Sequence, residues 1–243
     1  MGRQNRHEMS PESRSGLRHY RFGILLAALL GMLVYEPLIE LIAPKLPPVA
    51  SRFTFGIIFG WLTISAVYAV STRRQTPLVA LILGVPVFLA EIADVTLART
   101  ETHILTNTLG ILFLSHIVGV MLRFILQQNR ISTDTIFASL CVYLLVGIIW
   151  AIVYSLLGQV QPGAFSYVHA EEHQMRFGSE QTSLAIYFSF VTMTTLGYGD
   201  IVPVSTAARS LAILQAVFGQ FYLTVLVAWL VGLHIAHSRL EPK

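Results

Sequence analysis

The chain has 243 residues, of which 54% are hydrophobic and only 12% are charged. An ordinary soluble domain carries about 25% charged residues, so water is not the main solvent of this chain. Its single cysteine, Cys141, lies in an apolar run, which excludes an internal disulfide framework and a cysteine metal cluster. The net charge of +3 comes from basic residues in a few short segments, a pattern of membrane orientation rather than of nucleic-acid binding.

Residues 1–21 form a basic tail with little apolar content, and this composition predicts disorder or a position on a surface. The apolar run that follows also has the character of a signal-peptide core. No small-residue cleavage site comes after it, however, and the chain continues into further apolar runs. We therefore interpret the run as the first membrane span.

Six apolar runs are long enough, or nearly so, to cross a bilayer core about 30 Å thick. They lie at about Phe22 to Ala43, Phe53 to Val70, Pro77 to Asp94, Asn107 to Leu126, Thr135 to Leu157 and Ala208 to Ala236. The third run is the weakest, because Pro86 interrupts it and two acidic residues shorten it. We expect residues 22–130 to form a four-helix transmembrane domain and residues 131–240 to form a second domain.

Acidic residues occur in pairs near the outer ends of the first and third runs, three or four positions apart and so on one helical face. The pairs are Glu36 with Glu40 and Glu91 with Asp94. They form either an outward-facing cation or proton site, assisted by His103 and His116, or interfacial groups paired with Lys45, Arg52 or Arg99. As a lone histidine in an apolar run, His116 more often makes a hydrogen bond between packed helices.

A polar stretch from Gly158 to Thr182 follows the fifth run, and the short apolar segment from Ser183 to Thr194 comes next. Twelve residues are too few to cross a bilayer as a helix, so this segment is predicted to enter the membrane and return. The polar stretch contains His169 and His173, which are four positions apart. They form either a divalent metal site, if helical, or part of a solvated acidic loop.

Glycines alternate with larger residues in the stretch Thr195 to Asp200, which reads TLGYGD. A pore that selects potassium replaces the ion's hydration shell with closely spaced backbone carbonyl oxygens. Pointing successive carbonyls inward requires backbone angles that Gly197 and Gly199 reach cheaply. The Thr195 hydroxyl can add an oxygen ring, and the Tyr198 ring can pack outward against the preceding helix.

Basic residues divide unequally between the two sides of the predicted membrane. Eleven of the 16 fall on the side of both termini, namely Arg3, Arg6, Arg14, Arg18, Arg21, Arg73, Arg74, Arg123, Arg130, Arg239 and Lys243. The other five are Lys45, Arg52, Arg99, Arg176 and Arg209. Both termini are therefore predicted to be cytoplasmic, in a multi-pass protein of the plasma (inner) membrane.

The stretch Phe188 to Asp200 resembles the pore loop of the potassium channel superfamily, and the sixth run is similar to the inner helices of prokaryotic channels of the pore-domain type. The resemblance covers about residues 135–236. Together with the six apolar runs, it implies an all-α membrane protein with six transmembrane helices, a re-entrant pore helix and a selectivity filter, assembled as a homotetramer with the fifth span outside and the sixth lining the pore. It implies no enzyme activity and no cofactor other than K⁺ bound in the filter.

The resemblance also assigns roles to single residues. The filter is Thr195, Leu196, Gly197, Tyr198 and Gly199, with K⁺ at the first four, and Asp200 at the outer mouth. The pore helix contributes Thr192 and Thr194. Gly219 is either a hinge for opening or a small residue that lets helices pack closely.

The fourth run carries only Arg123, at its inner end. Voltage sensing needs several arginines at every third position, because each elementary charge contributes only about 2.3 kcal/mol per 100 mV. We therefore expect no steep voltage dependence. The alternatives are a potassium transporter of the pore-loop kind, which normally carries four such loops in one chain, and a non-conducting regulatory subunit.

Overall fold

The structure is a computed structural model and describes residues 21–42, 48–70, 76–97, 100–128, 132–167 and 182–238. Within these residues the chain folds into helices α2 (Arg21–Ile42), α3 (Pro48–Val70), α4 (Thr76–Leu97), α5 (Thr100–Leu126), α6 (Thr133–Val160), α7 (Thr182–Met193) and α8 (Thr206–Ser238), with strands β1 (Phe165–Tyr167) and β2 (Ile201–Pro203). Each predicted run corresponds to one of the long helices, and the predicted short segment corresponds to α7.

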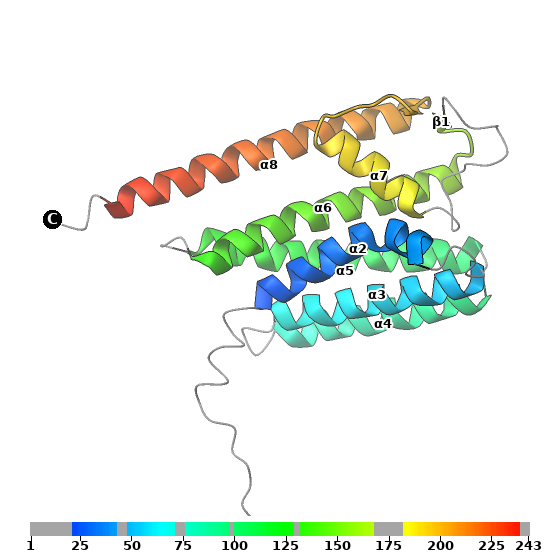
Figure 1. The fold of residues 1–243 in the computed structure, drawn as a ribbon, viewed down its shortest axis with the longest axis horizontal. Helices are drawn as coiled ribbons and strands as arrows, with labels where there is room; N and C mark the ends of the chain where they lie inside the picture. The colour runs from blue at the N-terminus through cyan, green and yellow to red at the C-terminus, as the bar shows by residue number, and fades with distance from the viewer. Residues whose placement is uncertain are drawn as a thin grey trace, which may run out of the picture.

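The long helices run side by side, with α6 between the α2 to α5 group and the pair α7 and α8 (Figure 1). Helix α6 packs against α2 and α5 on one side and against α7 and α8 on the other. Apolar side chains surround each long helix rather than forming one narrow stripe, which is typical of helices buried in protein or lipid. The described part of the chain is therefore organised around α6.

A continuous apolar core joins the first helices to α6. Leu25 of α2, Leu62 of α3, Phe113 of α5 and Leu145 of α6 are all essentially inaccessible to solvent. Outward-facing positions are apolar as well, such as Leu89 of α4, which is 60% exposed. A surface of this kind suits contact with lipid rather than with water.

Three described helices are long and apolar enough to cross a membrane by length and composition, namely Thr100–Leu126, Thr133–Val160 and Thr206–Trp229. Helices α2, α3 and α4 also have at least 22 residues each, and a helix of 22 residues is about 33 Å long. Helix α4 continues through Pro86. The six-span count remains a prediction.

The all-α prediction is incomplete in one place. Strands β1 and β2 pair in an antiparallel arrangement that places Ser166 opposite Val202. The Ala164 carbonyl also accepts hydrogen bonds from the backbone N–H groups of Val204 and Ser205. This small sheet ties the chain that leaves α6 to the chain that enters α8, and it thereby encloses α7 and the segment after it (Figure 1).

Candidate functional site

Helix α7 is held against α6 by close packing and by a hydrogen bond. The Ser189 hydroxyl donates to the Gly147 carbonyl oxygen at 2.6 Å. A Cβ at Gly147 would lie 2.6 Å from the Phe190 ring, so glycine is required at this crossing. On the neighbouring turns, the Phe188 ring meets Tyr154 and Phe165 edge to face, with centroids 4.9 and 5.3 Å apart. The middle of α7 is thus fixed in an aromatic cluster.

The backbone after α7 turns its N–H groups back toward that helix. The N–H groups of Leu196 and Gly197 both donate to the Val191 carbonyl, at 2.9 and 3.3 Å, and Thr195 N–H donates to the Thr192 carbonyl. In a planar trans peptide the C=O points opposite to the N–H. The carbonyls of Thr194, Thr195 and Leu196 are therefore directed away from α7. Three successive carbonyls on one side cannot occur in a regular strand, whose peptides alternate.

Positive φ angles make this backbone path possible. Gly197 has φ +54° and Gly199 has φ +79°, values that glycine adopts without a steric penalty. Thr195 has φ +59°, which the sequence analysis did not anticipate for a β-branched residue. Its hydroxyl donates to the Thr194 carbonyl at 2.6 Å. The oxygen retains lone pairs that can face a cation.

The larger side chains of this segment lie on the surface of the single chain. Tyr198 is 67% exposed and Leu196 is 55% exposed. We expected the Tyr198 ring to pack against the preceding helix. In the single chain, this ring instead remains largely exposed. Thr192 lies in the last turn of α7, and Thr194 follows it with its hydroxyl donated to the Phe190 carbonyl at 2.7 Å.

Asp200, at the end of the segment, accepts hydrogen bonds from a side chain of α7 and from the backbone. The Tyr187 hydroxyl of α7 donates to Asp200 Oδ2 at 2.6 Å, and the Ile201 backbone N–H donates to Asp200 Oδ1 at 3.0 Å. The hydrogen bond to Asp200 is the main reason that the pKa of Tyr187 is raised to about 12. Tyr187 therefore keeps its proton near neutral pH and braces the carboxylate. No local sequence pattern predicts this hydrogen bond, since the two residues are 13 positions apart.

Helix α8 approaches the end of α7 closely at Gly219. A Cβ at this position would overlap the Met193 carbonyl oxygen and lie 2.9 Å from Met193 Cγ. One turn further, the Tyr222 hydroxyl donates to the Ser139 carbonyl of α6 at 2.7 Å. The close approach supports the packing alternative for Gly219, and it leaves the hinge alternative untested.

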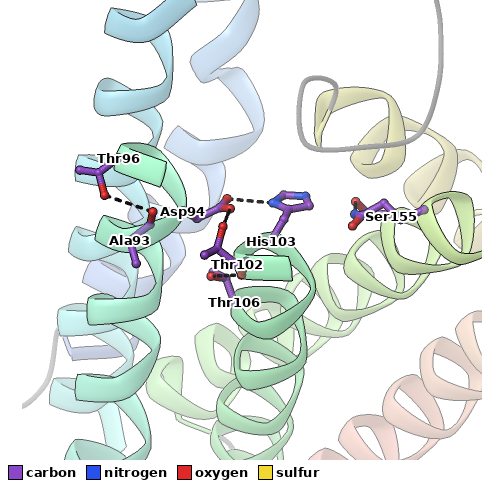
Figure 2. A network of polar contacts seen from close by, with 8 residues as sticks. Ala93, Asp94, Thr96, Thr102, His103, Thr106 and Ser155 are labelled. Atoms are coloured by element: carbon purple, nitrogen blue, oxygen red, sulfur yellow. Dashed lines mark hydrogen bonds and ion pairs between the residues drawn. The ribbon is translucent and has the colours of Figure 1, made fainter. Parts of the chain in front are cut away.

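The acidic and histidine candidates are only partly brought together. Figure 2 shows Asp94 of α4 pointing at His103 and Thr102 of α5. The distance from Asp94 Oδ2 to His103 Nδ1 is 2.8 Å, and Thr102 Oγ1 donates to Asp94 Oδ1 at 3.0 Å. His116 lies about 20 Å further along α5, by the helix rise, and cannot join this cluster.

Other candidates fall outside the description. The side chains of Glu36 and Glu40 are not among those that the structure describes, and Lys45, Arg99 and the stretch with His169 and His173 lie outside the described residues. Within the described ranges, no group of three or more histidine, cysteine or acidic side chains is placed to hold a metal ion.

Comparison with known proteins points to one family for the second half of the chain. Residues 135–233 match the family described as an ion channel. The chain is 41% identical over 68 residues to two pore potassium channel b of Oryza sativa subsp. japonica, which is 28% of this chain and 18% of that protein. It is 30% identical over 88 residues to potassium channel KOR1 of the same plant, which is 36% of this chain and 10% of that protein.

A third relative is two-pore potassium channel 5 of Arabidopsis thaliana, with 30% identity over 80 residues, 33% of this chain and 20% of that protein. The matched part thus spans a fifth or less of each of these relatives. No solved structure matches the chain.

Proposed function

Because residues 135–233 match the family described as an ion channel and the matched relatives are potassium channels, we propose that this chain is one subunit of a potassium-selective channel that conducts K⁺ passively. Under this proposal the protein is a multi-pass membrane protein of the channel class and not an enzyme, as the family match and the long apolar helices support. Under this proposal, Thr195, Leu196, Gly197, Tyr198 and Gly199 form the selectivity filter.

One observation carries the proposal. The N–H groups of Leu196 and Gly197 share the Val191 carbonyl, which directs the carbonyls of Thr195 and Leu196 away from α7. Carbonyl oxygens stacked on one side of an extended segment are the ligands that replace the hydration shell of K⁺. The positive φ angles of Gly197 and Gly199 are compatible with continuing this arrangement outward.

A single loop cannot surround an ion, so the proposal requires four chains around one axis. The exposed apolar side chains of α8 support this, since Phe221 is 66% exposed and Val225 is 65% exposed in the single chain. Contact with neighbouring subunits would cover side chains of this kind. In the homotetramer, α8 lines the pore and α6 lies outside it.

Electrostatics favour a cation at both ends of the proposed filter. The carboxyl end of α7 leads directly into Thr194 and Thr195, and a helix dipole places about half a negative charge at that end. Asp200 follows the filter, and four copies would concentrate cations at the outer mouth.

The proposal places the channel in the plasma (inner) membrane with both termini in the cytoplasm, on the basis of the excess of basic residues on that side. Arg123 is the only arginine in α5, so four chains together lack the repeated charges of a voltage sensor. The channel is therefore proposed not to be steeply voltage-gated.

Flux through the purified full-length chain in liposomes tests the proposal. We expect K⁺ flux to exceed Na⁺ flux strongly. Gly197→Ala should lower K⁺ flux by about tenfold or more, because a left-handed alanine costs roughly 1–2 kcal/mol in each chain. No neighbouring atom lies within 4 Å of a Cβ at Gly197, so the effect would come from the backbone angle rather than from a clash within the chain.

Gly119→Ala is the matched control. Gly119 lies on an exposed position of α5, and a Cβ there also has no neighbour within 4 Å. Its flux should equal that of the wild type. Equal Na⁺ and K⁺ flux in the wild type, or equal K⁺ flux in the two alanine variants, would contradict the proposal.

A further inference from the structure

A buried polar network joins α6, α7 and α8 at Gln215. The Tyr154 hydroxyl of α6 donates to Gln215 Oε1 at 2.7 Å. Gln215 Nε2 in turn lies 2.7 Å from the hydroxyl and 3.0 Å from the carbonyl oxygen of Ser189 on α7. All three residues are fully buried within the single chain. The network therefore needs no second subunit to exclude solvent.

The network has only one arrangement in which its hydrogen bonds are satisfied. The Ser189 hydroxyl accepts from Gln215 and donates to the Gly147 carbonyl. If the Gln215 amide were reversed, Oε1 would face the Ser189 carbonyl oxygen, and two acceptors would meet. A glutamine is suited to this position because its amide carries an acceptor and two donors without a net charge.

The network lies two residues from the backbone that supports the proposed filter. The Ser189 carbonyl accepts a hydrogen bond from the Gln215 amide. Two residues further along α7, the Val191 carbonyl accepts hydrogen bonds from the N–H groups of Leu196 and Gly197. Helix α7 has only 12 residues, and helices of this length are marginal without tertiary contacts. A rotation of α7 about its axis would move the Val191 carbonyl and, with it, the carbonyls of the filter.

Packing alone does not account for Gln215. An apolar side chain would fill the same volume without the cost of burying an amide, and polar residues within membrane segments usually serve a function. Tyr222 offers a contrast on the same helix, because its hydroxyl joins α8 directly to the α6 backbone at Ser139. Of these two hydrogen-bonded contacts of α8, the one at Gln215 reaches α7.

We infer that Gln215 is a positioning residue that fixes the rotation of α7, and thereby the register of the filter, through its hydrogen bonds to Tyr154 and Ser189. The inference rests on the proposed function, because it assigns Gln215 a part in K⁺ selectivity. Gln215 does not itself touch the ion.

The ratio of K⁺ to Na⁺ flux in liposomes tests this role, since a residue that only stabilises the fold lowers the amount of channel without changing the ratio. Tyr154→Phe and Gln215→Met should each lower the ratio by about fivefold or more, as expected for a buried partner left unpaired. Tyr222→Phe is the matched control, because it removes a hydroxyl with a bond of the same 2.7 Å length that does not reach α7.

An unchanged ratio in Tyr154→Phe and Gln215→Met, or an equal fall in Tyr222→Phe, would overturn the inference. If Gln215→Met does not assemble, Ser189→Ala takes its place, because it removes the hydroxyl and leaves the carbonyl bond to Gln215. That variant should lower the ratio by a smaller factor, and an unchanged ratio would again overturn the inference. A wild-type channel without K⁺ preference would contradict the proposed function itself, which separates the two failures.

Discussion

Three residues between Thr195 and Gly199 have positive φ angles, and one of them is not glycine. A β-branched residue in the left-handed region costs on the order of 1–3 kcal/mol, so the surrounding bonds must impose it. Thr195 is bound on both sides, because its N–H donates to the Thr192 carbonyl and its hydroxyl donates to the Thr194 carbonyl. The strain lies next to the carbonyls proposed to meet K⁺, where a defined oxygen geometry has functional value.

The hydrogen bond from Tyr187 to Asp200 should change the titration of the tyrosine. Its pKa of about 12 lies above the ordinary value of 10, so the stabilisation from its bond to Asp200 is complete below pH 10 and is lost as pH rises through 12. The ultraviolet absorbance of tyrosinate measures this directly. Subtracting the absorbance titration of Tyr187→Phe from that of the wild type isolates the ionisation of Tyr187. The midpoint of this difference should lie near pH 12, and a midpoint near 10 would contradict the hydrogen bond.

The contacts of α8 with α6 and α7 described above follow one stripe of the helix. Gln215, Gly219 and Tyr222 are spaced four and three positions apart, which places them on one face. They meet α7 at Ser189, α7 at Met193 and α6 at Ser139, respectively. Hydrogen bonds therefore flank a point of very close backbone approach.

Gly219→Ala tests the close approach of α8 to α7. The added Cβ would overlap the Met193 carbonyl, which is backbone and cannot swing away, so we expect a loss of about 1–3 kcal/mol in stability. Thermal unfolding in detergent measures the loss. Gly232→Ala, where a Cβ on α8 has no neighbour within 4 Å, should unfold like the wild type. A variant with unchanged stability and altered opening would favour the hinge alternative instead.

At the scale of the whole molecule, two kinds of apolar surface remain on the single chain. Leu89 of α4 belongs to the group of helices on the far side of α6, whereas Phe221 belongs to α8 (Figure 1). Lipid can cover the first. The proposed fourfold pore requires that protein cover at least part of the second, because a loop from one chain cannot enclose an ion.

Native mass spectrometry from mild detergent tests this difference. The wild type should have the mass of four chains. Phe221→Ala should release smaller species, because it truncates a large side chain that we place between subunits, where aromatic residues often dominate the binding energy. Leu89→Ala removes a similarly exposed apolar side chain from α4 and should leave the tetramer intact. A wild type with the mass of one chain would contradict the assembly.

The sequence alone established the helical class, the order of the helices and the position of the glycine-rich segment, since apolar runs of about 20 residues and alternating glycines are local signals. Apolar runs do not give the ends of the helices. Helix α5 begins at Thr100 rather than near Asn107, because its helical hydrogen bonds also include the polar residues that precede the apolar run. Gln215 was visible only as a polar residue in an apolar run.

Only the tertiary structure decided the hydrogen-bond partners of Gln215, Asp94 and Tyr187. Tyr154 and Gln215 are 61 positions apart, and β1 meets β2 across an intervening helix. Strands of three residues are also too short to show a period of two. Such contacts depend on how helices cross, which the spacing of residues along one helix does not specify. Hydropathy therefore predicted which segments are helices, whereas packing determined which side chains join α6, α7 and α8.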